Sequence, residues 1–349
     1  MVPVLEAVPN LSAGRDRALV ERLVETVTGL GAEVLDASMD PDHNRAVLTM
    51  IGPPNAVEDA AVEVARVAVE EIDLSKHSGV HPRIGALDVL PFVPLMGLTI
   101  EDARASALRA GERITNELGV PVFFYGEASD PPGRGLSELR AGGFEALARE
   151  FPADRVPDRL PVDWPHAGAH PTAGVTCVGA RALLLAWNVE VEGLTEGEVN
   201  RLAADLRERG GGFAGLRALG LFLPSNGRFQ VSMNLEDVRN RNPFDVFREI
   251  ENRVRSAGGS VVSTEVVGAL PDELVFQAGA DRLKLLDPDP SRVLSSRLTA
   301  HVMRRAAHET GRLGAVLREA GGGTPLEVRQ AVERLESSLN GFEPWNETR

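Results

Sequence analysis

The order of strand-like and helix-like segments limits the fold of this chain more than any other feature. In the first part of the chain, helical spacing of apolar side chains and short β-branched runs alternate. They predict, in order, a strand at 2–8, a helix at 14–30, strands at 33–38 and 45–52, a helix at 56–72 and a strand at 84–92. This βαββαβ order is that of a ferredoxin-like domain. A further helix at 100–118 and a strand at 121–125 follow.

A second series of segments repeats the same order. It consists of a strand at 182–192, a helix at 196–209, two strands at 214–223 and 228–235, a helix at 244–254 and a strand at 260–267. The turn-rich tripeptide 225–227 (SNG) joins the paired strands. We therefore predict an α+β protein with two ferredoxin-like (βαββαβ) subdomains, the first over residues 1–178 and the second over residues 179–290.

Two stretches fall outside these series. Residues 151–174 are rich in proline and glycine, which predicts irregular backbone. This stretch is either a linker or a binding loop held between two rigid halves, where ligand sites tend to lie. Residues 291–349 are polar and helical in pattern, with a break at 321–323 (GGG), and we expect a C-terminal helical tail.

Composition narrows the cellular setting and the partners. The single cysteine, Cys177, cannot form an internal disulfide, and no signal peptide or membrane-spanning run is read, so we expect a cytoplasmic protein without a membrane partner. The net charge of −14 disfavours nucleic acid. An anionic substrate would then need a local group of Arg and Lys side chains.

The most unusual stretch is 76–89 (KHSGVHPRIGALDV). Pro82 disfavours the helical conformation at His81, and Gly79 allows a tight turn before it. His81 should therefore lie on irregular backbone between a helix and a strand, where side chains can face a cleft. An imidazole suits proton transfer near neutral pH. The alternative is a histidine that only holds a structural turn.

Metal binding is the weaker hypothesis for the polar residues. His77 and His81 are four apart, but Gly79 and Pro82 prevent the helix that would give this spacing a meaning. The other potential ligands are Asp40, Asp42, His43, His166 and His170. No zinc-type spacing with a third ligand is present, so we predict no metal. Arg45, which enters a strand, is a candidate anchor for a carboxylate.

Seven short motifs, in order along about residues 3–285, carry a resemblance to a known family. They are 8–15 (VPNLSAGR), 42–45 (DHNR), 77–92 (HSGVHPRIGALDVLPF), 125–128 (YGEA), 179–181 (GAR) with Asn188, 230–235 (QVSMNL) and 265–271 (EVVGALP). With them the chain resembles the glutamate formimidoyltransferase family, whose animal members are fused to a cyclodeaminase. The long His-Pro-Arg motif is the specific one.

The resemblance implies two ferredoxin-like subdomains, a homodimer, and transfer of a formimidoyl group between N-formimidoyl-L-glutamate and tetrahydrofolate in histidine breakdown. Tetrahydrofolate is a co-substrate and no metal is needed. The family's catalytic histidine falls on His81. A carboxylate, Asp40 or Asp42, is expected to orient its imidazole.

The resemblance also implies the binding residues. The family's folate-binding loop falls on Pro165, His166, Ala167, Gly168, Ala169, His170, Pro171, Thr172, Ala173 and Gly174. A second folate contact falls on Gly211, Gly212 and Phe213, where the animal enzymes carry an arginine. Leu11 and Ala13 replace the usual Phe and Glu beside Asn10, a further expected site residue. Arg45 and Arg83 are candidates for binding substrate carboxylates, or else structural ion pairs.

Three alternatives stay open. The same site would serve transfer of a formyl group from 5-formyltetrahydrofolate to glutamate. The chain would bind folate without catalysis if His81 took no part in chemistry. A metal hydrolase is the third.

Overall fold

The computed structural model describes residues 3–236, 242–268 and 330. The helical tail predicted for 291–349 lies outside the described residues, apart from residue 330. All the elements below belong to one compact unit that covers residues 1–275. Among the described residues, no helix combines the length and the apolar character that a membrane span needs.

The first sheet follows the predicted order and then widens. Its strands are β1 (Val4–Ala7), β2 (Asn10–Leu11), β3 (Glu33–Asp40), β4 (Arg45–Gly52), β5 (Leu87–Met96), β6 (Val122–Gly126) and β7 (Thr176–Ala180). Both β1 and β2 lie between β4 and β5, and β3 pairs with β4 on the other side. The βαββαβ prediction is therefore confirmed for this half. Two strands parallel to β5 extend the sheet, with β7 between β5 and β6.

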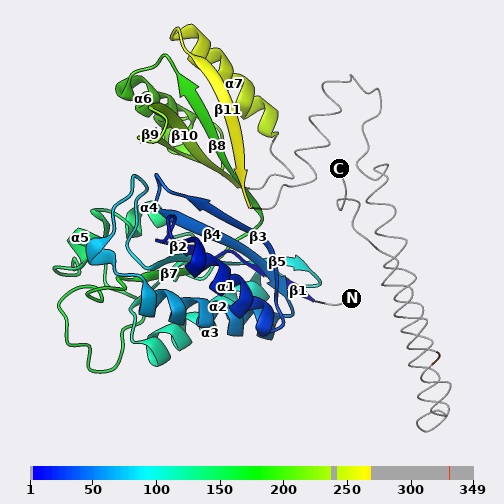
Figure 1. The fold of residues 1–349 in the computed structure, drawn as a ribbon, viewed down its shortest axis with the longest axis vertical. Helices are drawn as coiled ribbons and strands as arrows, with labels where there is room; N and C mark the ends of the chain where they lie inside the picture. Colours follow the sequence, from blue (N-terminus) through cyan, green and yellow to red (C-terminus); the bar gives the residue numbers. More distant parts are fainter. Residues whose placement is uncertain (1–2, 237–241, 269–329, 331–349) are drawn as a thin grey trace. The chain divides into compact units, whose positions relative to one another are not determined.

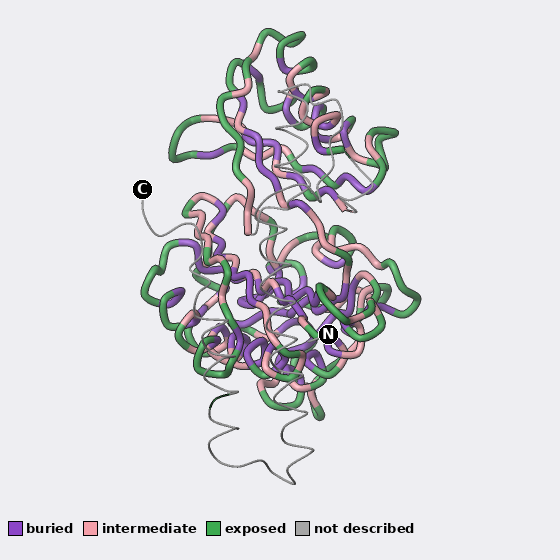
Figure 2. Tube along the Cα trace, turned by 90° about the vertical axis from the view of Figure 1, so that its right-hand side faces the viewer, coloured by how far each residue is buried: buried purple, intermediate pink, exposed green. Residues whose placement is uncertain are grey.

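Three helices pack on one face of this sheet (Figure 1): α1 (Arg17–Gly29), α2 (Pro54–Glu71) and α3 (Ile100–Leu118). Thr99 and Asp102 form a capping box at the start of α3, and Gly119, at φ 69°, ends it. The buried sides of α2 and α3 carry many alanines, among them Ala61 and Ala107, which are fully buried. These small side chains let the helices approach the sheet and each other closely. Figure 2 shows the buried positions gathered along the strands and the inner helix faces.

The second sheet has four antiparallel strands and two helices. The strands are β8 (Leu184–Glu192), β9 (Leu216–Leu223), β10 (Arg228–Glu236) and β11 (Ser260–Val267), in the order β11-β8-β10-β9. The helices are α6 (Glu196–Leu206) and α7 (Pro243–Ser256), and a short 3₁₀ turn, η2 (Glu208–Gly210), follows α6. The second βαββαβ series is thus confirmed, with α6 ending before residue 209. Its own core includes Val189, Val231 and Ile250, all fully buried.

The segment between the halves has irregular backbone, as predicted, but it is well packed. Before it lie the short helices α4 (Leu136–Leu139) and α5 (Gly143–Leu147), and a 3₁₀ turn, η1 (Leu74–Lys76), precedes β5. Ala169 and Ala173 are buried at 2% and 1% exposure. The Ala169 N–H donates to Leu147 O, and the Ala86 N–H donates to Ala173 O. This segment is therefore anchored to the first sheet and α5 rather than suspended as a free linker.

Candidate active site

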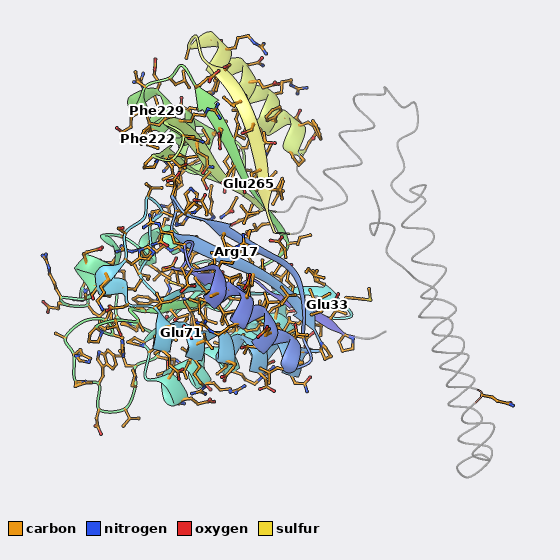
Figure 3. All side chains as sticks on the ribbon, in the orientation of Figure 1. Arg17, Glu33, Glu71, Phe222, Phe229 and Glu265 are labelled. Carbon is orange, nitrogen blue, oxygen red and sulfur yellow. The ribbon has the colours of Figure 1, made fainter. Side chains whose placement is uncertain are left out.

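A cavity of about 490 Å³ receives side chains from both sheets. From the first sheet, Glu6, Asn10 and Arg45 line it; from the second, Asn188 on β8 and Glu265 on β11 do so. Figure 3 labels Glu265 on β11. His81 also lines this cavity. Both halves of the chain therefore contribute to one concave site of the size that holds small ligands.

Asp88 on β5 organises the positive charge beside this cavity. It is fully buried, and its Oδ2 accepts from Arg45 Nη1 at 2.8 Å and from Arg140 Nη2. Its Oδ1 accepts from the Ile84 N–H at 2.8 Å. Burial alone would raise the pKa of Asp88, but Arg140 and Arg45 lower that pKa to about 2. Asp88 is thus a carboxylate that fixes two guanidinium groups of the cavity wall.

Arg45 carries one of these two guanidinium groups. Its side chain is 10% exposed, and its Nε and Nη2 donate to Asn10 Oδ1 at 3.1 and 2.8 Å. Asn10 is in turn held by its own Nδ2, which donates to Val8 O. The structure therefore brings together two of the predicted binding residues, Asn10 and Arg45, in the cavity.

His81 is half-buried on the irregular backbone predicted for it. Its Nδ1 donates to Pro82 O at 2.8 Å, which leaves the lone pair of the neutral ring on Nε2. Burial lowers the pKa of His81 well below its usual value, and Arg45, Arg140 and His43 lower it further, while Asp88 acts in the opposite direction. At neutral pH the ring is therefore an uncharged base.

The carboxylates expected to orient His81 have other partners. Asp40 Oδ1 accepts from the N–H groups of Asp42 and His43, each at 2.8 Å. Asp42 Oδ2 accepts from the hydroxyl and the N–H of Ser225. Within the described part of the chain, the hydrogen-bond partner that fixes His81 is the Pro82 carbonyl. The expected carboxylate–imidazole pair at His81 is therefore not among the contacts of this structure, and Asp40 lines the cavity together with His81.

His43 is a second imidazole beside His81. It is buried at 6% exposure, its ring centroid lies 5.4 Å from that of His81, and it lines the same cavity. Its Nδ1 lies 3.6 Å from Asp40 Oδ2. Its Nε2 is buried and has no hydrogen-bond partner among the described residues. Sequence reasoning considered His43 only as a metal ligand.

Close backbone contacts hold the two histidine loops together. A Cβ on Gly79 would lie 2.3 Å from His43 O, so this approach requires glycine. The Val80 N–H donates to Asp42 O at 3.0 Å. Asn44, at φ 48°, accepts from the Gly14 N–H and donates to Ser78 O. The motif at 42–45 and the motif at 77–92 thus form one structural unit.

Arg83 is the predicted binding residue that the structure places elsewhere. Its guanidinium donates to His77 Nδ1 and His77 O, and it forms an ion pair with Glu145 at 2.7 Å. Arg83 does not line the cavity. Its contacts are those of a structural ion pair, one of the two possibilities that the sequence left open.

The two predicted folate-binding segments also lie outside the cavity lining. In the loop from Pro165 to Gly174, His170 Nδ1 accepts from the Ala173 N–H at 3.0 Å, and the His166 ring lies 4.9 Å from the Trp164 ring. Gly211 has φ 80°, and a Cβ on Gly212 would lie 2.3 Å from Leu206 O. Phe213 packs on the core of the second sheet. The contacts seen in both segments are with the fold itself.

Three cavity-lining residues escaped the sequence analysis as site residues, namely His43, Arg140 and Glu6, and so did Asp88, which binds Arg45 and Arg140. Glu6 is 5% exposed, burial raises its pKa against the opposing effect of Arg181, and its Oε2 has no hydrogen-bond partner among the described residues. The available signal was a charged residue inside an apolar strand, at Glu6 in β1 and at Asp88 in β5. Over the described residues, no group of three or more His, Cys, Asp and Glu side chains is arranged to hold a metal ion.

Comparison with known proteins identifies the family of this chain. Residues 4–181 match the formiminotransferase domain, N-terminal subdomain, and residues 186–284 match the formiminotransferase domain. A glutamate formimidoyltransferase of Streptococcus pyogenes is 35% identical over 83% of this chain and 96% of its own length. One from Thermoplasma acidophilum is 32% identical over 84% and 97%.

A longer relative shows the same match on part of its length. The formimidoyltransferase-cyclodeaminase of Sus scrofa is 37% identical over 80% of this chain and 52% of its own length. The two family matches together cover most of the chain. The loops of His43 and His81, the cluster of Asp88, Arg45 and Arg140, and both sheets apart from the first two residues of β8 lie within them. The chain belongs to the formiminotransferase family.

Proposed function

We propose that this protein is a glutamate formimidoyltransferase, which moves a formimidoyl group between N-formimidoyl-L-glutamate and tetrahydrofolate. The observation that carries the proposal is the imidazole of His81, fixed by Pro82 O in the lining of a cavity with two guanidinium groups. The matched family and the relatives from Streptococcus pyogenes and Thermoplasma acidophilum support the same assignment. Tetrahydrofolate acts as a co-substrate.

The reaction needs one base at the attacking nitrogen. N5 of tetrahydrofolate attacks the sp² formimidoyl carbon, and the N5 proton leaves to the lone pair on His81 Nε2. Nδ1, bound to Pro82 O, keeps the ring oriented throughout. Placing both substrates in one cavity supplies a further part of the rate acceleration.

The glutamate carboxylates need cationic partners, and the cavity has them. Arg45 uses its Nε, one Nη1 donor and one Nη2 donor on Asn10 and Asp88, so two donors remain for a ligand. The Nε of Arg140 is buried without a partner among the described residues. We propose that Arg45 and Arg140 bind the carboxylates of the glutamyl substrate. These two arginines are the local cationic group that an anionic substrate needs on a chain whose net charge is −14.

The remaining family properties belong to the same proposal. We propose a cytoplasmic homodimer active in histidine breakdown, with two subdomains at 1–178 and 179–290. The loop from Pro165 to Gly174, toward the pterin or its tail, and the segment Gly211, Gly212 and Phe213, toward the tail, stay proposed folate contacts. Sedimentation of the purified protein tests the dimer.

The decisive experiment is a spectrophotometric assay of the purified chain with formimidoyl-glutamate and tetrahydrofolate. We expect turnover that requires both substrates. A parallel assay with 5-formyltetrahydrofolate and glutamate measures the competing formyl transfer. Tight folate binding without turnover in either assay would identify a binding protein instead.

A further inference from the structure

We infer that His43 is a second acid–base group of this site, which donates the proton to the departing glutamate nitrogen, and that Asp40 positions it. The inference rests on the proposed function. It assigns a separate proton donor to the second half of the reaction, in place of a single histidine that serves both halves.

The ring of His43 has one nitrogen beside a carboxylate and one nitrogen without a hydrogen-bond partner among the described residues. Asp40 Oδ1 is fixed by two backbone N–H groups, and Asp40 Oδ2 lies 3.6 Å from His43 Nδ1. Nδ1 is therefore turned to the carboxylate, and Nε2 is the buried nitrogen that has no partner among the described residues. A buried imidazole nitrogen without a partner destabilises a fold, so its retention beside a cavity indicates a ligand.

The surroundings of the two imidazoles differ in charge. A proton on His81 would face the guanidinium groups of Arg45 and Arg140 as well as His43, against the single carboxylate of Asp88. The charged group beside His43 Nδ1 is instead the carboxylate of Asp40, at 3.6 Å. One ring therefore lies near two guanidinium groups and the other beside a carboxylate.

The proton movements balance with two histidines. The new bond joins N5 of tetrahydrofolate to the formimidoyl carbon, and the N5 proton passes to neutral His81. The bond between that carbon and the glutamate nitrogen then breaks, and its electron pair stays on the nitrogen, which takes the proton from His43 Nε2. With ring centroids 5.4 Å apart, one proton passing from His81 to His43 restores the starting state. No metal, oxidant or covalent intermediate on the protein is required.

The test uses the full chain with His43→Ala and Asp40→Asn. For His43→Ala we expect kcat to fall about 10²-fold with the Michaelis constants within a few-fold, as for loss of a general acid. Added imidazole should restore part of kcat. Asp40→Asn keeps an oxygen for the two backbone N–H groups and removes the charge, so kcat should fall about tenfold at an unchanged unfolding midpoint.

His77 provides the matched control. It lies outside the cavity, and both its nitrogens have partners, Asn44 O and Arg83 Nε. His77→Ala should therefore show no response to imidazole. Unchanged kcat in folded His43→Ala would overturn the inference, as would a kcat that imidazole raises equally in both alanine variants. Should His43→Ala fail to fold, Asp40→Asn decides alone, and full kcat in that variant overturns the inference.

A separate measurement distinguishes this inference from the proposed function. In protein with labelled histidines, replacing His43 should raise the pKa of His81, because the charge of His43 is one of the causes that lower it. This shift is expected even if the protein does not turn over formimidoyl-glutamate. An unsubstituted protein without turnover rejects the proposed function, whereas an unshifted His81 titration rejects the coupling of the two rings.

Discussion

The two sheets share one strand order and differ in what they bury. The first sheet and its helices bury four charged side chains, Glu6, Arg45, Glu58 and Asp88. In the second sheet, the buried polar side chains of the described residues are uncharged, namely Asn188 and Gln230. Among the described residues the buried charge therefore lies in the first half, and the second contributes a mainly apolar core and part of the cavity lining. The two halves thus share a strand order but bury different kinds of polar side chain.

The two additional strands of the first sheet allow it to bury charged side chains. In the first sheet β7 and β6 continue beyond β5, so that β5 has neighbours on both sides, β2 and β7. Asp88 on this inner strand can then be fully buried with two arginines. Within the described residues the second sheet has four strands, with β11 and β9 at its edges.

The largest expected effect is on catalysis in the first half. His81→Ala should lower kcat by about 10²–10⁴-fold, because the base that accepts the N5 proton is lost. Folate binding should stay within a few-fold, measured by titration. Ser232→Ala, on the cavity side of the second sheet, is the comparison and should cost less than tenfold. Equal losses of kcat in both variants would show that the two sheets contribute equally to catalysis.

The next effect is on stability in the same half. Asp88→Asn leaves Arg45 and Arg140 without their buried counter-charge, which should lower the free energy of unfolding by about 3–5 kcal/mol. Denaturant unfolding measures it. Asp59→Asn removes a surface pair with Arg113 and should leave the free energy of unfolding almost unchanged. A similar small loss for Asp88→Asn would show that the buried cluster is not structural.

A truncation in the second half should act on stability alone. Ile250 on α7 is fully buried in the second core, and Ile250→Ala should lower the free energy of unfolding by about 2–5 kcal/mol. Below the unfolding transition, kcat should equal that of the unsubstituted protein. A large fall in kcat of the folded variant would show that the second sheet positions the reacting groups.

Acid should lower the free energy of unfolding by protonating Asp88 in the first half. Burial opposes ionisation of Asp88, yet Arg140 and Arg45 hold its pKa at about 2, below the value of about 3.9 expected in the unfolded chain. The stability from this carboxylate is complete above about pH 4 and is lost as pH falls toward 2, an effect of about 2–3 kcal/mol. Unfolding free energies between pH 5 and 2 should therefore fall less steeply in Asp88→Asn. Parallel curves would assign acid sensitivity elsewhere.

The smallest expected effect concerns the loop at 165–174. If His166 and His170 contact the folate tail, replacing both with Gln should raise the Michaelis constant for tetrahydrofolate a few-fold with kcat unchanged. The loop is anchored by Ala169 and Ala173, so no loss of stability is expected. An unchanged Michaelis constant would limit the folate contacts to the cavity.

Most of the fold was predictable because hydrophobic periodicity records it directly. Both βαββαβ series and the helix at 100–118 are confirmed. β7 was missed, since its five residues follow irregular backbone and form a buried run without alternation. β2 was missed because Pro9 interrupts the first strand, and pairing with β4 and β5 resumes it.

The site was predictable only where one residue marks it. His81 stands out because Pro82 follows it. Its closeness to His43 depends on the approach of Gly79 to His43 O, a contact across 36 positions of the chain that no local pattern encodes. The same holds for Arg140 and Asp88, which meet only after β5 and α4 are in place.

The single thiol of the chain can report how often the first sheet opens at β7. Cys177 lies in β7, between β5 and β6, and is fully buried. Burial and nearby Asp88 raise the pKa of this thiol to about 12, so almost no thiolate is present at neutral pH. A thiol reagent can modify it only when β7 opens to solvent. Since the chain has no other cysteine, the rate of modification would time the opening of this one strand without any engineered label.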